Sequence, residues 1–216
     1  MGSIEERLLE AAAVVAGAGL VDAFGHISIR DGDELLITAP VPLAFQTPEQ
    51  LVRIRIDCSE LPLGAPKEAW IHLAIARAHP ATGAVCRAQP RAVAKAVAAR
   101  RALRPLDGQG ALLGPHVPVH ADSRLIRDRV SADAVVDALH DAPAVVLYGN
   151  GAVTHGADAA AAVARMWLLE RSAELTLAAP EETELPADQQ AWWRERDSEL
   201  LPRIYEHLVR THAASG

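Results

Sequence analysis

Seven polar residues are expected at strand ends or in turns, the positions at which α/β proteins tend to place binding and catalytic side chains. Arg87 and Gln89 fall two residues apart at the end of an apolar strand, so both are expected on one face. Two polar groups in such a place need partners or a ligand, and a guanidinium favours an anionic one. The full set is His26, Thr38, Lys67, Glu68, Arg87, Gln89 and Asn150.

Several of these residues also have a purely structural interpretation. His26 follows Gly25 at the start of a strand, where a histidine often completes a turn. Glu68 precedes an apolar helix and would favour its positive end, and Lys67 beside it would be a solvated charge. Asn150 stands between two glycines and suits a turn. The sequence leaves both interpretations open.

Sequence motifs for the common cofactors are absent. The chain contains no GxGxxG after a strand, no phosphate-binding Gly-rich loop, and no HExxH, CxxC or GxSxG. His116, His120 and His155 could ligate a metal ion, but they lack a compact spacing and are expected at the surface. These motifs therefore indicate no cofactor.

The composition describes one acidic globular domain. The chain has 216 residues, half of them hydrophobic, and 21 Lys and Arg against 28 Asp and Glu, which argues against a nucleic-acid partner. Cys58 and Cys86 are too few for a disulfide framework and indicate a reducing compartment. The chain begins without the pattern of a signal peptide and lacks an apolar run long enough to span a membrane. We therefore expect a cytoplasmic protein without a membrane partner.

The periodicity predicts alternating helices and strands. The aromatic residues are few and alanine is abundant, which favours helices packed closely on a sheet and thus an α/β fold. Residues 101–121 are expected to form a long surface excursion. Helix 123–139 is expected to break near Ser131, and the final helical segment, 188–212, is expected to kink or split at Pro202. The remaining predicted helices are 4–18, 68–78, 92–99 and 158–178, and the strands are 25–30, 35–37, 51–56, 83–86 and 144–147.

The order of motifs to about residue 178 resembles the class II aldolase and adducin family. Residues 25–30, Gly-His-Ile-Ser-Ile-Arg, are similar to the family's Gly-(Asn/His)-(Val/Ile)-Ser strand. Glu68 and His72 match its Glu-x-x-x-His helix, and residues 77–80 match the Arg-x-x-Pro that ends it. The turn at 151–156 also resembles the family's. The resemblance implies a three-layer fold with a central mixed, largely antiparallel sheet flanked by helices.

The resemblance also divides the chain and implies an oligomer. Residues 1–179 form the family domain, and residues 180–216 form an acidic linker and a helical tail that packs on the same domain or on a neighbouring subunit. Members are commonly tetramers with sites between subunits, so a homo-oligomer, with a tetramer favoured, is expected. The tail carries Trp192 and Trp193, which are expected near a subunit interface.

The chain departs from the family at its metal site. Members hold a divalent metal with a His-x-His pair before a proline and a third histidine in a turn, and a glutamate acts as acid and base. Here Arg87 and Gln89 precede Pro90, and Asn150 takes the third position. A guanidinium cannot ligate a cation and amides are poor zinc ligands, so we expect no metal. Glu68 alone remains from the family's catalytic set.

These departures suggest a metal-independent lyase that acts on a small carboxylate or carbonyl substrate by decarboxylation or carbon–carbon bond chemistry. Arg87 would anchor the carboxylate or oxyanion and Glu68 would move the proton. The other five polar residues, His26, Thr38, Lys67, Gln89 and Asn150, would bind the substrate. His26 also resembles the family branch that contains decarboxylases of hydroxylated aromatic acids.

Two alternatives remain open at the level of sequence. The first is a non-catalytic, adducin-like binding or assembly protein, which fits the loss of all three metal-binding histidines. The second is a different metal site built from His26, His72 or His155.

Overall fold

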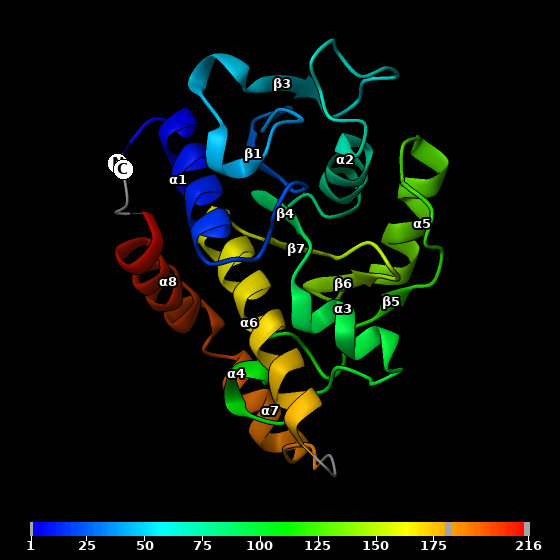
Figure 1. The fold of residues 1–216 in the computed structure, drawn as a ribbon, viewed down its shortest axis with the longest axis vertical. Coiled ribbons are helices and arrows are strands. Elements are labelled where there is room, and N and C mark those ends of the chain that lie inside the picture. Colours follow the sequence, from blue (N-terminus) through cyan, green and yellow to red (C-terminus); the bar gives the residue numbers. More distant parts are fainter. Residues whose placement is uncertain (1, 180–182, 214–216) are drawn as a thin grey trace.

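A computed structural model describes residues 2–179 and 183–213 of the chain and shows a seven-stranded sheet between two layers of helices (Figure 1). The strand order is β3-β2-β1-β4-β7-β6-β5, in which β5 and β6 are parallel and the other neighbours are antiparallel. The predicted mixed, largely antiparallel sheet is therefore confirmed. The strands are β1 His26–Asp31, β2 Glu34–Ile37, β3 Val52–Arg55, β4 Ala84–Ala88, β5 Val119–His120, β6 Ala144–Leu147 and β7 Ala152–Gly156.

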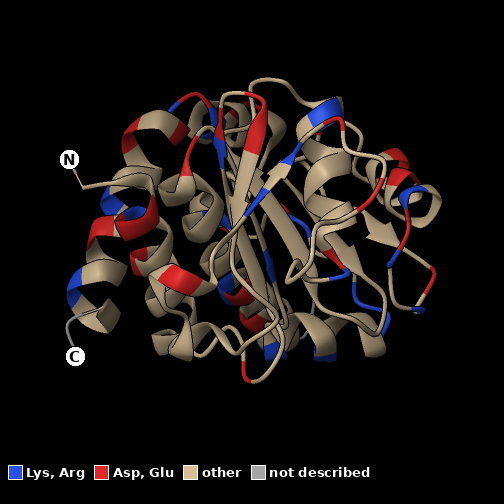
Figure 2. Ribbon diagram, turned by 90° about the horizontal axis from the view of Figure 1, so that it is seen from above, with Lys and Arg blue, Asp and Glu red and all other residues tan. Residues whose placement is uncertain are grey.

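The two helical layers bury the two faces of the sheet. Side chains alternate along each strand, so Ile27 and Cys86 enter one core while Val85 and Val153 enter the other. The first core is covered by α1 Ile4–Gly17, α3 Arg91–Ala98 and α6 Ala159–Ala178, with α8 Asp197–Leu208 packed outside α6. The second is covered by α2 Ala69–Ala78 and α5 Arg129–Leu139. Seen from above, the strands run through the centre with helices on both sides, and acidic and basic segments are intermingled (Figure 2).

The C-terminal tail packs on the same chain. Leu201 and Leu208 are buried in the core that α1 and α6 share, and the Tyr205 hydroxyl donates to Glu10 Oε1 of α1 at 3.0 Å. The tail comprises α7 Ala187–Arg194, α8 and a π-helical turn, Val209–Ala213. The predicted acidic linker begins at residues 180–182, which lie outside the described residues. Trp192 is half exposed, with the Arg196 guanidinium over its ring.

Three predicted elements differ from the structure. Helix α5 begins at Arg129, with the Asp128 side chain capping it by accepting from the Ser131 N–H, so residues 123–127 are not helical and the predicted break near Ser131 is wrong. The tail breaks at residues 195–196 instead of at Pro202, which α8 contains within it. Strand β7 has no predicted counterpart, and the excursion over 101–121 contains a short helix, α4 Gly108–Ala111.

Within the described ranges, no helix combines the length and the apolar character that crossing a membrane requires. Cys58 and Cys86 are both free thiols, and burial raises the pKa of Cys86 to about 12.

Candidate active site

The pairing of β1 with β4 brings His26 and Arg87 opposite one another. The two residues are partners in the antiparallel register, at the beginning of β1 and near the end of β4. Because Ile27 and Cys86 point into the core beneath α1 and α6, His26 and Arg87 project from the other face, on which α2 lies. Glu68 stands directly before α2, at its N-cap position. The fold thus assembles three of the predicted site residues from three separate elements.

The Glu68 carboxylate lies close to a histidine and an arginine side chain. Its Oε2 atom lies 4.0 Å from His26 Nε2, and its Oε1 atom lies 3.4 Å from Arg127 Nε. The Glu68 side chain is 15% exposed, so it is sheltered but still open to solvent. The carboxylate can therefore contact a ligand and exchange a proton with water.

His26 is held as a neutral imidazole. Its burial lowers the pKa to about 4, the nearby Arg87 charge acts in the same direction, and Glu68 opposes both. The Nδ1 atom is buried and has no hydrogen-bond partner in residues 2–179 or 183–213. A neutral imidazole with a free nitrogen can donate to or accept from a substrate without adding charge.

Arg87 is fixed by the turn between β6 and β7. Its Nη2 donates to Asn150 Oδ1 at 2.6 Å and to the Asn150 backbone oxygen at 3.3 Å, and Gln89 Nε2 lies 3.4 Å from the same Oδ1. The turn needs Gly151, which has a φ of 86° and whose missing Cβ would lie 2.1 Å from the Ala88 carbonyl oxygen. This close approach brings Asn150 to the end of β4.

The guanidinium of Arg87 keeps unused donor capacity. The side chain is buried, and this burial lowers its pKa while the Glu68 charge acts in the opposite direction. Its Nε atom is buried and, among the described residues, has no hydrogen-bond partner. A guanidinium remains charged even so, and the spare N–H can donate to an anionic oxygen.

The structure does not bring the other two predicted residues into this cluster. The Thr38 hydroxyl is buried and accepts from the Ile27 N–H at 3.1 Å, so it joins β2 to β1. Lys67 is exposed on the loop before α2. Gln89 and Asn150 line a cavity of about 160 Å³ with residues of α3 and the β6–β7 turn.

Two polar residues near the cluster, Arg127 and Ser28, were not among the predicted site residues, and His72 was considered only for the alternative metal site. Arg127 lies in the loop before α5, where no periodic pattern marks it. Ser28 and His72 form a buried pair, with Ser28 Oγ 2.8 Å from His72 Nδ1. Burial and the neighbouring His26 and Arg87 hold the pKa of His72 well below its usual value. The one available signal was the position of Ser28 two residues from His26, on the same face of β1.

The donor set does not fit a divalent metal. The three positions that the sequence resemblance assigns to metal-binding histidines hold a cationic guanidinium and two amides, and Arg87 donates to the amide oxygen of Asn150 instead of leaving it for a cation. Within the part of the chain that the structure describes, no three His, Cys, Asp or Glu side chains converge on a point that could hold a metal ion. His155 lies at the far end of β7, hydrogen-bonded to Thr82 and Ala142.

The chain belongs to the class II aldolase and adducin family, since the model of the "Class II Aldolase and Adducin N-terminal domain" matches residues 6–177. Among curated relatives, the 3,4-dihydroxyphthalate decarboxylase of Terrabacter sp. (strain DBF63) is 34% identical over 213 residues, covering 87% of this chain and 88% of that protein. The 3,4-dihydroxyphthalate decarboxylase of Arthrobacter keyseri is 30% identical over 190 residues, covering 80% of this chain and 77% of that protein.

Solved structures show the same fold. An aldolase II superfamily protein from Pseudomonas syringae superposes with a TM-score of 0.82 at 22% identity, covering 99% of this chain and 93% of that one. L-fuculose-1-phosphate aldolase from Thermus thermophilus superposes with a TM-score of 0.73 at 29% identity, covering 82% of this chain and 98% of that one. The predicted family and fold are confirmed, and the expectation of a lyase agrees with the names of the curated relatives.

Proposed function

We propose that this protein is a decarboxylase of small hydroxylated aromatic carboxylates, with 3,4-dihydroxyphthalate as the first candidate substrate. The proposal depends on one observation: Glu68, His26 and Arg87 lie close together in a sheltered part of the protein. Their side chains bring a carboxylate, a neutral imidazole and a buried cation to one site. The relatives named as 3,4-dihydroxyphthalate decarboxylases support both the reaction and the substrate class.

Each residue has a defined task in this reaction. Arg87 binds the substrate carboxylate or a ring oxygen anion through its free Nε–H, while Gln89, Asn150 and His26 orient the ring. Glu68 delivers a proton, taken up from solvent, to the ring carbon that carries the carboxylate. The bond to the carboxylate then breaks, its electron pair returns to the ring, and CO₂ leaves. Glu68 regains a proton from solvent, so one proton is consumed for each CO₂ released.

The reaction as proposed needs no divalent metal. Arg87 supplies, at the family's metal position, the positive charge that stabilises the developing anion. Its buried position strengthens this effect, because less water screens the charge.

The test is decarboxylation of 3,4-dihydroxyphthalate, followed as CO₂ release and as formation of the monocarboxylate. Arg87→Met is expected to lower kcat/KM by about 10²–10³-fold, the effect of losing one donor to a developing oxyanion. The matched control is Arg91→Met, which removes an exposed arginine paired with Asp22 and should retain full activity. Thermal unfolding of each variant shows whether it is folded.

Two results would contradict the proposal. Full activity of a folded Arg87→Met variant would exclude Arg87 as the anchor. Failure of the parent protein to decarboxylate any of a panel of hydroxylated aromatic acids would exclude the decarboxylase and favour the adducin-like binding protein.

Metal independence has a separate test. The parent and an Arg87→His, Gln89→His, Asn150→His variant are dialysed against zinc and manganese and then measured by elemental analysis. We expect the variant to take up one metal per chain and the parent none, with parent activity unchanged by a chelator. Stoichiometric metal in the parent would refute this part of the proposal.

We also propose that the protein works as a homo-oligomer, with a tetramer favoured. Three large apolar side chains that are exposed in the single chain lie two residues in sequence from His26, Arg127 and Asn150. They are Phe24 at 65%, Leu125 at 50% and Tyr148 at 47%. Exposed apolar groups gathered around a site favour an interface there. Light scattering at micromolar concentration tests the assembly, and a monomer would refute it.

A further inference from the structure

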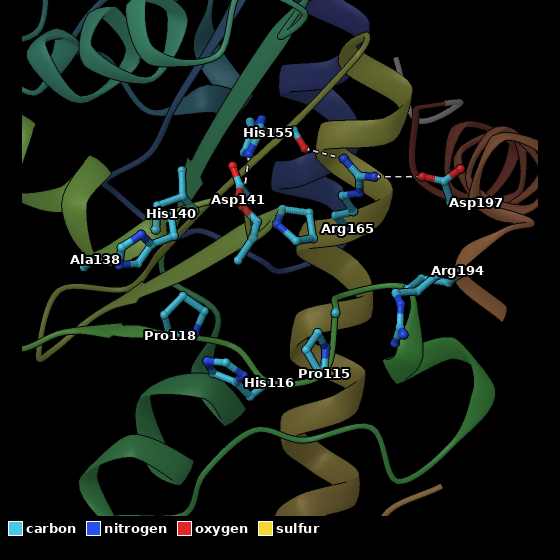
Figure 3. A pocket seen from close by; sticks show the side chains of 15 residues that line it. Pro115, His116, Pro118, Ala138, His140, Asp141, His155, Arg165, Arg194 and Asp197 are labelled. Atoms are coloured by element: carbon cyan, nitrogen blue, oxygen red, sulfur yellow. Dashed lines mark hydrogen bonds and ion pairs between the residues drawn. The ribbon is translucent and has the colours of Figure 1, made fainter. Parts of the chain in front are cut away.

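A second cavity, of about 860 Å³, lies at the opposite end of β6 and β7 from the candidate active site. Its volume is in the range of sites for small organic molecules. The walls come from five regions of the chain: the loop after α4, the connection from α5 to β6, the end of β7 at His155, the first half of α6, and the junction of α7 and α8 (Figure 3).

The two sites are distinct because of the strand geometry. Asn150, in the turn after β6, belongs to the candidate active site, whereas Pro143, just before β6, lines the second cavity. The strand between them spans residues 144–147, which at about 3.3 Å per residue separates the sites by about 10 Å or more. His155, which also lines the cavity, lies at the far end of β7 from the turn at Asn150.

Two arginines give this cavity a cationic side. Figure 3 shows Arg165 from α6 and Arg194 from α7 on one side, across from Ala138 and His140. Arg165 donates through Nη1 to the His155 backbone oxygen at 2.7 Å and through Nη2 to Asp197 at 3.1 Å, so its position is fixed.

Each of these arginines has a buried N–H that lacks a partner. Arg165 Nε and Arg194 Nη1 are buried, and neither has a hydrogen-bond partner in the described parts of the chain. Arg194 also has no ion pair with a described residue. Unpaired buried donors on charged groups cost free energy, which an anionic ligand with two oxygens would recover. Asp141 and Asp197 also line the cavity, and Asp197 pairs with Arg165, so the net charge of the walls alone does not favour an anion. The unpaired N–H donors are therefore what favours an anionic ligand.

The remaining walls fit an apolar body. Leucine, proline and alanine side chains supply most of them, namely Leu112, Pro115, Pro118, Ala138, Leu139, Ala142 and Pro143. His140 closes one wall with a φ of 48°, a left-handed conformation that is costly for a residue with a side chain. His116 stands exposed at the rim.

From these contacts we infer that this cavity is a second ligand site, which binds a small organic carboxylate with a ring-sized apolar body. The carboxylate bridges Arg165 and Arg194, and the body fills the space between the proline and leucine walls. The site does not depend on the proposed decarboxylation, since it shares no residue with the Glu68–Arg87 cluster.

Isothermal titration of the full-length protein with phthalate tests this site, and inorganic phosphate is the second probe. Four proteins are compared: the parent, Arg194→Met, Arg87→Met and the control Arg129→Met, which removes an exposed arginine of α5. Arg194→Met keeps the length of the side chain and removes its donors. We expect it to weaken phthalate binding at the second cavity at least about tenfold, while Arg87→Met and Arg129→Met leave this binding unchanged. Arg194→Lys, which keeps the charge but loses the planar fork, is expected to lose part of the affinity.

The outcomes separate this site from the proposed active site. Binding that Arg87→Met removes and Arg194→Met leaves intact would place phthalate at the Glu68 cluster alone and overturn the inference. Binding of inorganic phosphate without phthalate would overturn the organic-carboxylate assignment, and so would a parent that binds neither probe. Loss of decarboxylase activity in Arg87→Met with retained phthalate binding would support both sites independently.

Discussion

Replacing His26 by Gln is expected to make the stability of the protein less sensitive to acid. In the folded protein burial holds the pKa of His26 at about 4, against 6.5 for an unperturbed histidine. The unfolded chain therefore binds a proton at this residue at a higher pH than the folded one. The stabilisation is complete above pH 6.5 and is lost as the pH falls through 4.

The two pKa values set the size of the effect. Relative to pH 7.5, protonation of His26 in the unfolded chain lowers the free energy of unfolding by about 1.3 kcal/mol at pH 5.5 and by about 2.5 kcal/mol at pH 4.5. Other groups also respond to acid, so the informative quantity is the difference in pH dependence between the parent and His26→Gln, which removes this contribution and keeps a polar side chain of similar reach.

Urea unfolding at pH 7.5, 5.5 and 4.5 measures this difference. The control is His116→Gln, because His116 is exposed and its replacement should leave the pH dependence of the parent unchanged. Equal pH dependence in His26→Gln and the parent would show that His26 titrates normally in the fold. The proposed role of His26 as a neutral ligand for substrate would then be wrong.

Three further substitutions test other features. Gly151→Ala is expected to destabilise the fold by about 2 kcal/mol or more in urea unfolding, because the new Cβ would lie 2.1 Å from a β4 carbonyl oxygen, whereas Gly149→Ala, whose new Cβ would make only an ordinary 3.5 Å contact with Ser123, should cost about 1 kcal/mol for its positive φ. Asn150→Ala removes the 2.6 Å acceptor of Arg87 and should lower kcat by about tenfold or more, and unchanged kinetics would show that this contact does not position the guanidinium. Leu208→Ala should cost about 2–5 kcal/mol if the tail belongs to the core of the same chain, and a loss below about 1 kcal/mol would contradict that packing.

The sequence predicted which side chains share a strand face better than it predicted which strands pair with one another. Alternation along residues 25–30 and the two-residue spacing of Arg87 and Gln89 were enough to orient these side chains, since such patterns depend on local period alone. The register that sets His26 opposite Arg87 is a long-range property and has no local signal. The resemblance to the family helped to group Glu68, His26, Arg87, Gln89 and Asn150 in advance, but it did not predict this register.

Elements whose form depends on neighbours were harder to predict. Strand β7 contains Thr154 and His155 in an otherwise short apolar run, and its pairing with β4 and β6 decides its conformation. Pro202 gives a strong breaking signal, yet burial of Leu201 and Leu208 against α6 keeps α8 continuous around it. The second cavity arises from five distant segments, so no sequence window contains its pattern.

The edges of the sheet constrain how copies of this chain can associate. One edge strand, β5, has two residues, too few to template another strand. The other, β3, carries Arg53 and Arg55, and Arg53 is engaged by Asp31 at 2.7 Å and by Glu5 at 3.1 Å. Hydrogen-bonded extension of the sheet from one molecule into the next is therefore disfavoured at both ends. In the proposed homo-oligomer, subunits would therefore meet through helices and loops, and the same edge features protect the chain against fibrous aggregation.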